Sequence, residues 1–512
     1  MGKVIGRKQA SIYNMISMGA YQLTTALFGF ILPNLILRTY GANLHGYTST
    51  VTNIMAYIAL VNAGLAPAAV QALYAPLVRK DEKRICEILQ AIDRFYIISG
   101  CLYTVAVVGT AYIMPLVIGE QLPGAIATAL MIVIGASNTM ECFVYSKYKV
   151  LLQADQKLYV VSMVDQVFYL IRIVSQIALI RVGASIVWVM LVPAIMVIGR
   201  MGALAVFCRK NYHFSVKGVK PDYRSLSNRW SAMIHQIAGL VVFNTDVTLL
   251  TIFGTLAEVS IYSVYNLIFN QLYHFLTNIF SSGTLASFGQ LLSENKRDRL
   301  LKAYDIYEFG YFLVIAFVYG VSGAMILPFV SVYTIHVTDV VYARPMVAIL
   351  FLIIGIANNI RIPCLSMINA AGHFKNTQNH AMLEALINIT VSLLLLKPLG
   401  MYGLLIGTIC SFAYRTTIII IYAQKNILKI SCKTTLKRLT YLIVILGISN
   451  LIYYFLIGKY KLSTWTQWIG YAVLASAITG TVILTVVLIV DGRMLKDCLS
   501  MVLHSNNKDR NG

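Results

Sequence analysis

Long apolar stretches alternate with short polar segments from one end of the chain to the other. Most of the apolar stretches have about 20 residues, the length that an α-helix needs to cross the hydrocarbon core of a bilayer. Strands of a membrane barrel would instead be segments of about 10 residues with alternating polarity. The pattern therefore predicts an all-α polytopic membrane protein. Its apolar stretches predict about fourteen transmembrane helices, at 12–37, 48–75, 95–118, 123–145, 158–180, 184–207, 231–253, 259–287, 308–332, 346–371, 381–397, 401–423, 439–457 and 466–490.

Composition agrees with this pattern. Of the 512 residues, 58% are hydrophobic and only 12% are charged, whereas a soluble domain usually has about 25% charged residues. The first apolar stretch continues past the length of a signal peptide and lacks an Ala-x-Ala-like site, so we expect a permanent helix. The eight cysteines form no Cys-x-x-Cys pair. We therefore expect neither a metal site, nor a cofactor, nor a disulfide framework.

The formal net charge of +21 could indicate a nucleic acid partner, but the placement of the charges follows a membrane topology. Most of the 41 lysines and arginines fall in segments that successive spans place on one side. Basic loops remain in the cytoplasm. We therefore predict cytoplasmic termini and no nucleic acid partner. Only six basic residues fall on the opposite side: Arg38, Arg181, Arg344, Lys397, Lys459 and Lys461.

The two halves of the chain have similar polar positions. Residues 135–141 of the fourth predicted span match residues 355–361 of the tenth at an offset of 220, and Arg200 matches Arg415 at an offset of 215. Repeated helical bundles are common in transporters. We therefore predict an N-terminal six-helix lobe at 1–207, a basic cytoplasmic linker at 208–230, a C-terminal six-helix lobe at 231–423, and two additional helices with a cytoplasmic tail at 424–512.

The tenth predicted span has an arginine and a proline near its centre. An arginine at the bilayer centre costs at least ~2.5 kcal/mol, so Arg361 should face protein or water. Pro363 removes a helical hydrogen bond and should kink the span. We favour a cavity in which Arg361 contacts substrate, with Asn358 and Asn359 on a hydrated wall. The alternative is an ion pair between Arg361 and Glu141 that fixes helix packing between the lobes.

Three further arginines fall inside predicted spans. Tyr169, Arg172 and Gln176 share one face of the fifth span, which makes Arg172 a second candidate for substrate contact. Arg200 and Arg415 lie about two turns from the cytoplasmic ends of their spans. They either extend their side chains to the interface or flank the cytoplasmic mouth and bind an anionic headgroup.

Carboxylates inside the spans are candidates for ion coupling. Asp246, Glu141 and Asp165 either mark a proton or cation site or form ion pairs with the arginines. The sequence has no phosphate-binding loop, no HExxH motif and no paired loop carboxylates beside a nucleophile. We therefore expect a non-enzyme whose transport is driven by an ion gradient, the membrane potential or consumption of the product.

Four short segments resemble bacterial polysaccharide flippases of the Wzx type. They are NTDVTLLTIFG at 244–254, VSIYS at 259–263, EALIN at 384–388 and GMYGLLIGT at 400–408. The resemblance points to the superfamily that also contains MATE multidrug extruders and MurJ-like flippases. It implies a V-shaped bundle of two six-helix lobes that works by alternating access. The two extra C-terminal helices would border a groove for a lipid tail.

The resemblance also implies a substrate. Flippases of this group move undecaprenyl-diphosphate-linked oligosaccharides to the outer leaflet of the bacterial plasma membrane through a cationic lumen. The first span has no arginine between Ile12 and Leu37, which counts against lipid II and favours a capsule, exopolysaccharide or O-unit substrate. Expected partners are this lipid-linked oligosaccharide, the lipid bilayer, and the glycan polymerase and glycosyltransferases of the same pathway.

Two alternatives remain open at this point. The first is a cation-coupled multidrug extruder on the same fold, for which the intramembrane arginines are unfavourable. The second is a membrane-embedded glycan polymerase or ligase. Such an enzyme is expected to have a large outer loop, and the predicted outer loops are short.

Overall fold

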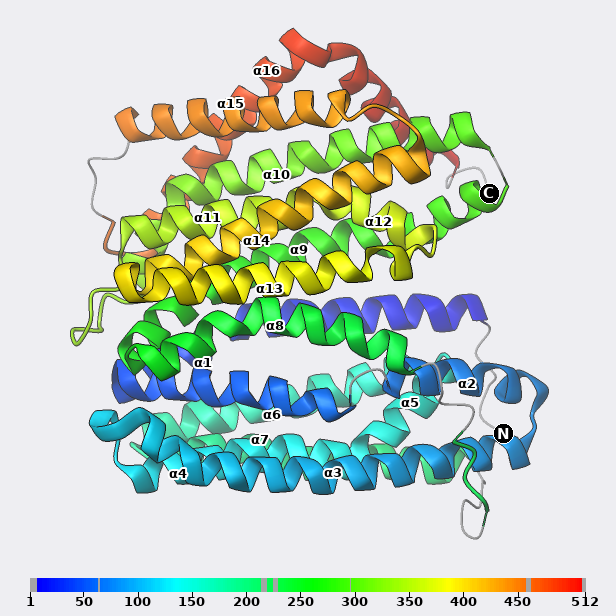
Figure 1. The fold of residues 1–512 in the computed structure, drawn as a ribbon, viewed down its shortest axis with the longest axis vertical. Helices are drawn as coiled ribbons and strands as arrows, with labels where there is room; N and C mark the ends of the chain where they lie inside the picture. Colours follow the sequence, from blue (N-terminus) through cyan, green and yellow to red (C-terminus); the bar gives the residue numbers. More distant parts are fainter. Residues whose placement is uncertain are drawn as a thin grey trace. The chain divides into compact units, whose positions relative to one another are not determined.

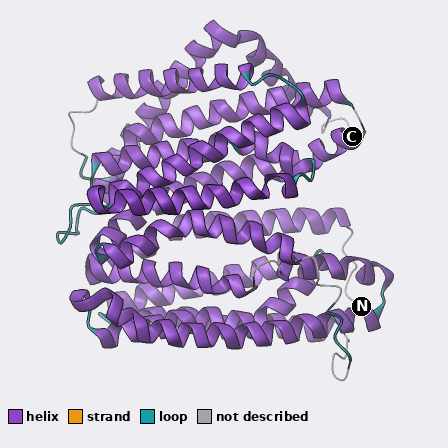
Figure 2. Ribbon diagram, in the orientation of Figure 1, coloured by secondary structure: helices purple, strands orange, loops and turns teal. Residues whose placement is uncertain are grey.

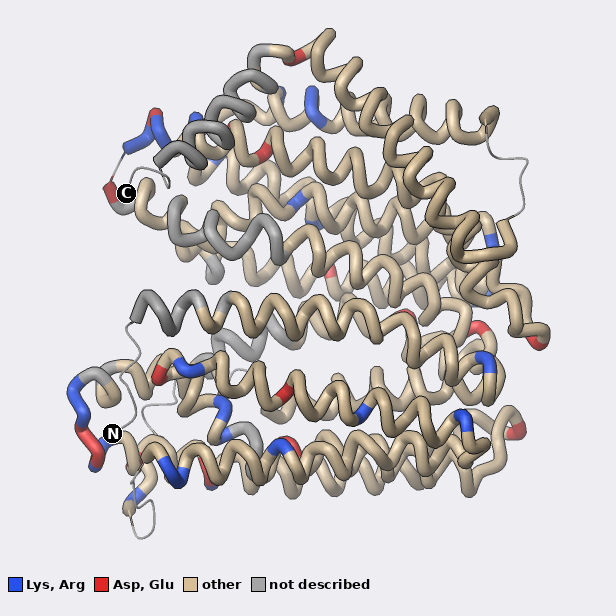
Figure 3. Tube along the Cα trace, turned by 180° about the vertical axis from the view of Figure 1, so that it is seen from behind, with Lys and Arg blue, Asp and Glu red and all other residues tan. Residues whose placement is uncertain are grey.

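The structure is a computed structural model that describes residues 7–62, 65–212, 219–223, 229–294, 296–456 and 462–508. These residues form helices and connecting loops, without a strand (Figure 2). Within this part of the chain, eleven helical stretches are long and apolar enough to cross a membrane. The predicted all-α, multi-pass membrane architecture is therefore confirmed. Figure 3 shows long stretches of these helices that carry no charged residue.

The first two predicted spans are joined by a tight connection. The segment α1 (Arg7–Ile58) consists of two helices that meet at a kink, one covering the first predicted span and the other reaching into the second. The change of direction occurs at Gly41, whose φ of 84° and ψ of 174° lie in a region that glycine adopts without steric cost. A glycine kink therefore replaces the polar connection that the sequence pattern predicted there.

The N-terminal compact unit comprises residues 1–263. Its helices pack mainly as the pairs α1 with α6, α3 with α4, α4 with α7, α6 with α7 and α1 with α8 (Figure 1). After α1, its elements are η1 (Ala59–Asn62), α2 (Leu65–Arg79), α3 (Glu82–Ile118), η2 (Gly119–Gln121), α4 (Gly124–Met140), η3 (Glu141–Tyr145), α5 (Ser146–Ala154), α6 (Leu158–Arg181), α7 (Ile186–Asn211) and α8 (Arg229–Phe253).

The C-terminal compact unit comprises residues 264–512. Its closest pairs are α13 with α14, α10 with α16, α11 with α14 and α10 with α15 (Figure 1). Its elements are α9 (Leu256–Ser293, which begins in the N-terminal unit), α10 (Arg297–Tyr333), α11 (Pro345–Ile360), α12 (Ile362–Ala370), α13 (Phe374–Leu399), α14 (Met401–Tyr422), η5 (Ala423–Leu428), α15 (Lys433–Leu456) and α16 (Trp465–Lys508).

Helix α8 packs with the N-terminal unit, although the sequence assigned it to the C-terminal lobe. Asn53 Nδ2 of α1 donates to Asn244 Oδ1 of α8 at 2.9 Å, and the hydroxyls of Thr50 and Thr251 are 2.8 Å apart. Of the predicted linker at 208–230, residues 213–218 and 224–228 lie outside the described residues. The division of the chain at that linker stays a prediction.

Two helices are irregular at matching positions of the predicted repeat. Helix α4 ends at Met140, and a π-helical turn begins at Glu141. Helix α11 ends at Ile360 and α12 begins at Ile362, so Arg361 lies at the break, with Pro363 in the first turn of α12. Proline is tolerated there because its missing N–H would have no helical partner. The helix is therefore interrupted next to Pro363, where the sequence predicted a kink.

Candidate functional site

The break between α11 and α12 places Arg361 against α13. Arg361 Nη1 donates to Glu384 Oε1 at 2.6 Å, and Arg361 Nη2 donates to Asn358 Oδ1 at 2.5 Å. The guanidinium also stacks over the ring of Phe412 on α14, 4.8 Å from its centroid. Arg361 is buried, so the guanidinium is held by a carboxylate, an amide and an aromatic face in the protein interior.

Arg415 on α14 binds the other oxygen of the same carboxylate. Arg415 Nε lies 3.5 Å from Glu384 Oε2, and Arg415 Nη1 donates to the Thr377 carbonyl at 3.0 Å. All three side chains of this cluster, Arg361, Glu384 and Arg415, are less than a tenth exposed. Buried charges are costly unless they are paired, and here one carboxylate serves two guanidiniums. The cluster therefore has an excess charge of +1 in the protein interior.

Asn358 and Asn359 have different surroundings. Asn358 belongs to the arginine cluster, as described above. Asn359 Oδ1 accepts a hydrogen bond from Tyr311 at 3.2 Å, and its Nδ2 donates to Tyr319 Oη at 2.8 Å. Both tyrosines belong to α10. Asn359 therefore joins α11 to α10, whereas Arg361 and Asn358 face α13.

Arg200 occupies a second charged cluster, within the N-terminal unit. Its Nη2 pairs with Glu141 Oε1 of η3, and its Nη1 lies 3.3 Å from Asp165 Oδ1 of α6. The side chain is about one fifth exposed. Arg200 and Arg415 are each bound to carboxylates of their own unit.

The predicted alternative for Arg361 was an ion pair with Glu141. The structure gives each of these residues a different partner within its own unit: Arg361 pairs with Glu384, and Glu141 pairs with Arg200. In the sequence, Glu384 was noted only as the first residue of the family-like segment EALIN. Its position inside a predicted span was a signal of the same kind as that of Glu141.

Arg172 stacks on an aromatic pair. Its guanidinium carbon lies 4.7 Å from the ring centroid of Tyr169, and that ring packs edge-on against Tyr21 of α1 at 6.0 Å. Arg172 Nε is buried and has no hydrogen-bond partner within the described part of the chain. Gln176, which the sequence placed on the same face, donates instead to the Val189 carbonyl of α7 at 3.0 Å.

Asp246 is deeply buried beside the contact between α1 and α8. It is 1% exposed, and Asp246 Oδ2 accepts a hydrogen bond from Tyr262 Oη of α9 at 3.0 Å. Two residues further along α8, Thr248 Oγ1 donates to Asn53 Oδ1 of α1 at 3.2 Å. A carboxylate in such an enclosed polar environment is a candidate for the coupling role considered from the sequence.

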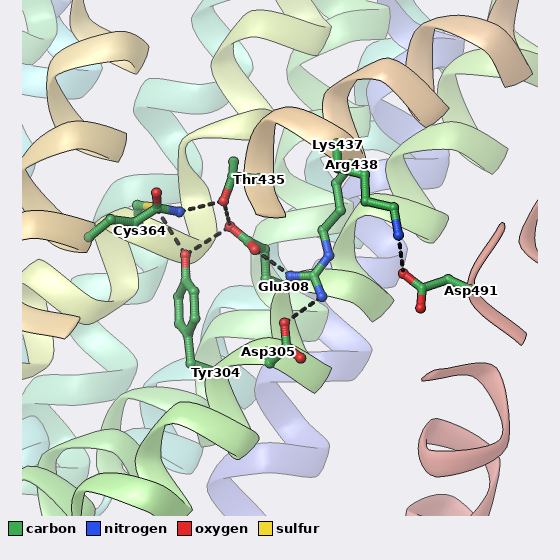
Figure 4. Close-up of polar contacts among 9 residues, drawn as sticks. Tyr304, Asp305, Glu308, Cys364, Thr435, Lys437, Arg438 and Asp491 are labelled. Atoms are coloured by element: carbon green, nitrogen blue, oxygen red, sulfur yellow. Dashed lines mark hydrogen bonds and ion pairs between the residues drawn. The ribbon is translucent and has the colours of Figure 1, made fainter. Parts of the chain in front are cut away.

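A third charged cluster escaped the sequence analysis (Figure 4). Glu308 of α10 accepts hydrogen bonds from Tyr304 Oη at 2.9 Å and Thr435 Oγ1 at 2.6 Å, and it also pairs with Arg438 Nη1 of α15. Arg438 Nη2 lies 2.6 Å from Asp305 Oδ1. The distribution of lysines and arginines along the sequence had placed Arg438 in a cytoplasmic segment. The structure buries it, so that α15 is joined to α10 by a buried ion pair.

Within the described residues, no group of three or more His, Cys, Asp and Glu side chains could hold a metal ion. The Arg361–Glu384–Arg415 cluster has two guanidiniums for one carboxylate, an arrangement suited to binding an anion. The clusters around Arg200 and Arg438 each have one guanidinium and two carboxylates.

Comparison with known proteins identifies the fold. No protein-family model matches the chain, and no curated protein matches its sequence. Among solved structures, the lipid II flippase MurJ in an inward closed conformation matches with a TM-score of 0.63 and 12% identity, covering 94% of this chain and 100% of that one. An inward-facing multidrug resistance MATE family transporter of the MOP superfamily matches with a TM-score of 0.60 and 13% identity, covering 80% and 98%.

A eukaryotic MATE transporter, AtDTX14, matches with a TM-score of 0.56 and 12% identity, covering 86% of this chain and 100% of that one. The chain therefore has the fold that MurJ and MATE transporters share. The predicted fold is confirmed, and the Wzx-type specificity remains a proposal.

Proposed function

We propose that the protein is a flippase that moves undecaprenyl-diphosphate-linked oligosaccharide across the bacterial plasma membrane, with both termini in the cytoplasm. The observation that carries this proposal is the Arg361–Glu384–Arg415 cluster. Two guanidiniums share one carboxylate there, and the side chains are buried inside a helical unit. The planar fork of arginine suits phosphate oxygens as well as carboxylates.

The chemistry of the substrate explains why such a cluster is needed. A glycan and a diphosphate lose their hydration in hydrocarbon, so a transporter must offer polar groups and positive charge in place of water. We assign the phosphate contacts to Arg361 and Arg415, with Asn358 beside them on the wall of a cationic cavity. The prenyl tail remains in lipid, and alternating access exposes the cavity to the opposite side.

The N-terminal unit supplies a second group of charged residues. Arg172 Nε is buried without a described partner and is available to an anionic ligand. Arg200, Glu141 and Asp165 pair with one another, so we assign them to charge pairing. Moving negative charge out of a cell whose interior is negative by 100 mV releases ~2.3 kcal/mol per charge. The membrane potential can therefore favour export of a diphosphate.

We assign the substrate to a capsule, exopolysaccharide or O-unit pathway, because the first span lacks arginines between Ile12 and Leu37. The glycosyltransferases and the glycan polymerase of that pathway would then supply the substrate and consume the product. The predicted role is transport without chemical change of the substrate.

Arg361→Ala is expected to reduce transport of the lipid-linked oligosaccharide at least about tenfold, because loss of one partner of a buried charge pair costs 2–5 kcal/mol. Arg361→Lys should restore part of the activity, since it keeps the charge but loses the fork. The measurement is translocation of an undecaprenyl-diphosphate oligosaccharide with a fluorescent sugar in proteoliposomes.

Lys437→Ala is the matched control for this experiment. It removes a positive charge from the same unit, but the side chain is half exposed and pairs weakly with Asp491 at 3.6 Å. Its transport rate should equal that of the wild type. Equal rates for Arg361→Ala and Lys437→Ala, with both variants folded in detergent by size-exclusion chromatography, would contradict the proposed function.

A cation-coupled multidrug extruder is the second candidate function. The buried Asp246–Tyr262 pair favours it, because intramembrane carboxylates mark proton and cation sites. Efflux of a cationic dye from cells that lack their own extruders would distinguish the two candidates. An extruder would show efflux that Asp246→Asn abolishes and Arg361→Ala preserves.

A further inference from the structure

The two oxygens of Glu384 bind different arginines. Oε1 accepts from Arg361 Nη1 at 2.6 Å, and Oε2 lies 3.5 Å from Arg415 Nε. Within the described residues these two guanidiniums are the polar partners of the carboxylate. Phosphate oxygens make the same kind of charge-assisted contact with arginine. The carboxylate therefore occupies the position that an anionic ligand of these arginines would take.

The two arginines have anchors that do not involve Glu384. Arg361 is held by Asn358 and by the ring of Phe412, and Arg415 is held by the Thr377 carbonyl. If the carboxylate moved away, these contacts would still orient both guanidiniums. Glu384 has no comparable anchor among the described residues. It is therefore the exchangeable member of the cluster.

Charge counting gives the consequence of such an exchange. With Glu384 ionised the cluster carries +1, and with Glu384 neutral it carries +2. A sugar-linked prenyl diphosphate carries two negative charges, one on each phosphate group. The neutral form of Glu384 therefore gives a balanced complex. A carboxylate that loses both arginines while it remains buried would be an unpaired charge, which is far more costly than its protonated form.

We propose that Glu384 is an internal counter-ion that competes with the diphosphate of the substrate for Arg361 and Arg415 and takes up one proton when the diphosphate displaces it. The proposal rests on the proposed function of this site. The proton comes from the aqueous phase that the site faces when the lipid binds. It leaves when the lipid leaves and the carboxylate returns to the arginines, so one proton accompanies each substrate.

The charged and titratable groups around Glu384 come from several elements. Arg361 lies between α11 and α12, Arg415 lies on α14, and Tyr273 of α9 lies within electrostatic range of both Arg361 and Glu384. His380, one turn away on α13, is bonded to Tyr414 Oη of α14 at 2.8 Å. Among these groups, Glu384 is the carboxylate, and it is the group that both arginines share.

The test is the pH dependence of lipid binding to the full-length protein in nanodiscs. The probe is an undecaprenyl-diphosphate monosaccharide, because its two phosphate groups are both esterified and stay ionised over the pH range of the test. If binding takes up one proton, the wild-type Kd should increase up to tenfold per unit between about pH 6 and about pH 8. Glu384→Gln should bind with a Kd that is independent of pH and at least about tenfold lower than the wild-type Kd near pH 8.

Asp491→Asn is the matched control, because it neutralises a carboxylate of the same unit that pairs with an exposed lysine. This variant should keep the pH slope of the wild type. A wild-type Kd without a pH slope, or a Glu384→Gln variant that keeps the slope, would overturn the counter-ion proposal and leave the proposed function intact. A wild-type protein that fails to bind the lipid at every pH would instead overturn the proposed function.

Direct measurement of proton uptake does not depend on whether the variant folds. Calorimetric titration of the wild type in two buffers with different ionisation enthalpies gives the number of protons taken up per lipid bound. The expected number near neutral pH is close to one. Zero protons per lipid would overturn the proposal even if Glu384→Gln could not be purified.

Discussion

Glu308→Gln is expected to lower the free energy of unfolding by about 3–5 kcal/mol, because it removes the buried counter-ion of Arg438 and leaves that arginine paired with the more exposed Asp305. Arg438 is only 3% exposed and pairs with Glu308, which is itself buried. The substitution preserves the shape of the side chain and its ability to accept from Tyr304 and Thr435. The loss would therefore measure the charge of the pair. Unfolding by denaturing detergent in mixed micelles, followed by circular dichroism, provides the measurement.

Asp305→Asn is the matched control for this stability experiment. Asp305 also pairs with Arg438, at 2.6 Å, but its side chain is 44% exposed. Exposed ion pairs contribute about 0–1 kcal/mol, so the variant should lose no more than this. Equal losses for Glu308→Gln and Asp305→Asn would show that the buried pair does not stabilise the α10–α15 contact.

A double replacement separates the charge of the ion pair from the hydrogen bonds of Glu308. Replacing both partners of a buried ion pair by apolar residues of similar size is often neutral. Glu308→Met combined with Arg438→Met is therefore expected to recover most of the stability that Glu308→Gln loses. A double variant as unstable as the single one would mean that losing the hydrogen bonds of Glu308 to Tyr304 and Thr435 costs as much as removing the buried counter-ion of Arg438.

Gly403→Ala is expected to destabilise the α13–α14 pair by about 3 kcal/mol, at the upper end of the usual cost of overpacking. A Cβ atom at Gly403 would lie 2.2 Å from the Leu395 carbonyl oxygen and 2.5 Å from its carbonyl carbon. These are backbone atoms that cannot rotate away. Small residues allow such close approach of membrane helices, so the added methyl group must push the two helices apart.

The separation should also affect the arginine cluster, because Glu384 lies on α13 and Arg415 on α14. Their contact of 3.5 Å would lengthen, and we expect slower transport as well as a lower melting temperature in detergent. Gly447→Ala on α15 is the control, since a Cβ there meets no atom within 4 Å. A melting temperature of Gly403→Ala equal to that of Gly447→Ala would contradict the predicted crowding.

Much of the fold could be predicted from the apolar pattern, because a bilayer forces each crossing segment to be a long apolar helix with internally satisfied hydrogen bonds. The break at Arg361 could also be predicted, from Pro363 beside a charged residue. The motif around Gly403 was quoted as a family-like signal, and the structure gives it a packing role against Leu395. Local rules of this kind require only the order of residues in the chain.

The partners of the charged residues could not be predicted in the same way. Both the lipid-facing and the protein-facing sides of a membrane helix are apolar, so periodicity says little about which way the helix is turned. The offset between the two halves of the sequence suggested Glu141 as the partner of Arg361. The partner is instead Glu384, which lies 23 residues further along the chain, on a different helix. Arg438 was counted with the cytoplasmic loops, although it is buried against Glu308.

Length and polarity of the segments thus define the membrane class, the helices and the positions where charge must be accommodated. The rotation of each helix about its axis and the distance between neighbouring helices decide which charges meet. Those quantities depend on tertiary contacts, both between helices far apart in sequence, such as α10 and α15, and between consecutive helices, such as α13 and α14. For this reason the excess positive charge shared by Arg361, Glu384 and Arg415 became visible only in the tertiary structure.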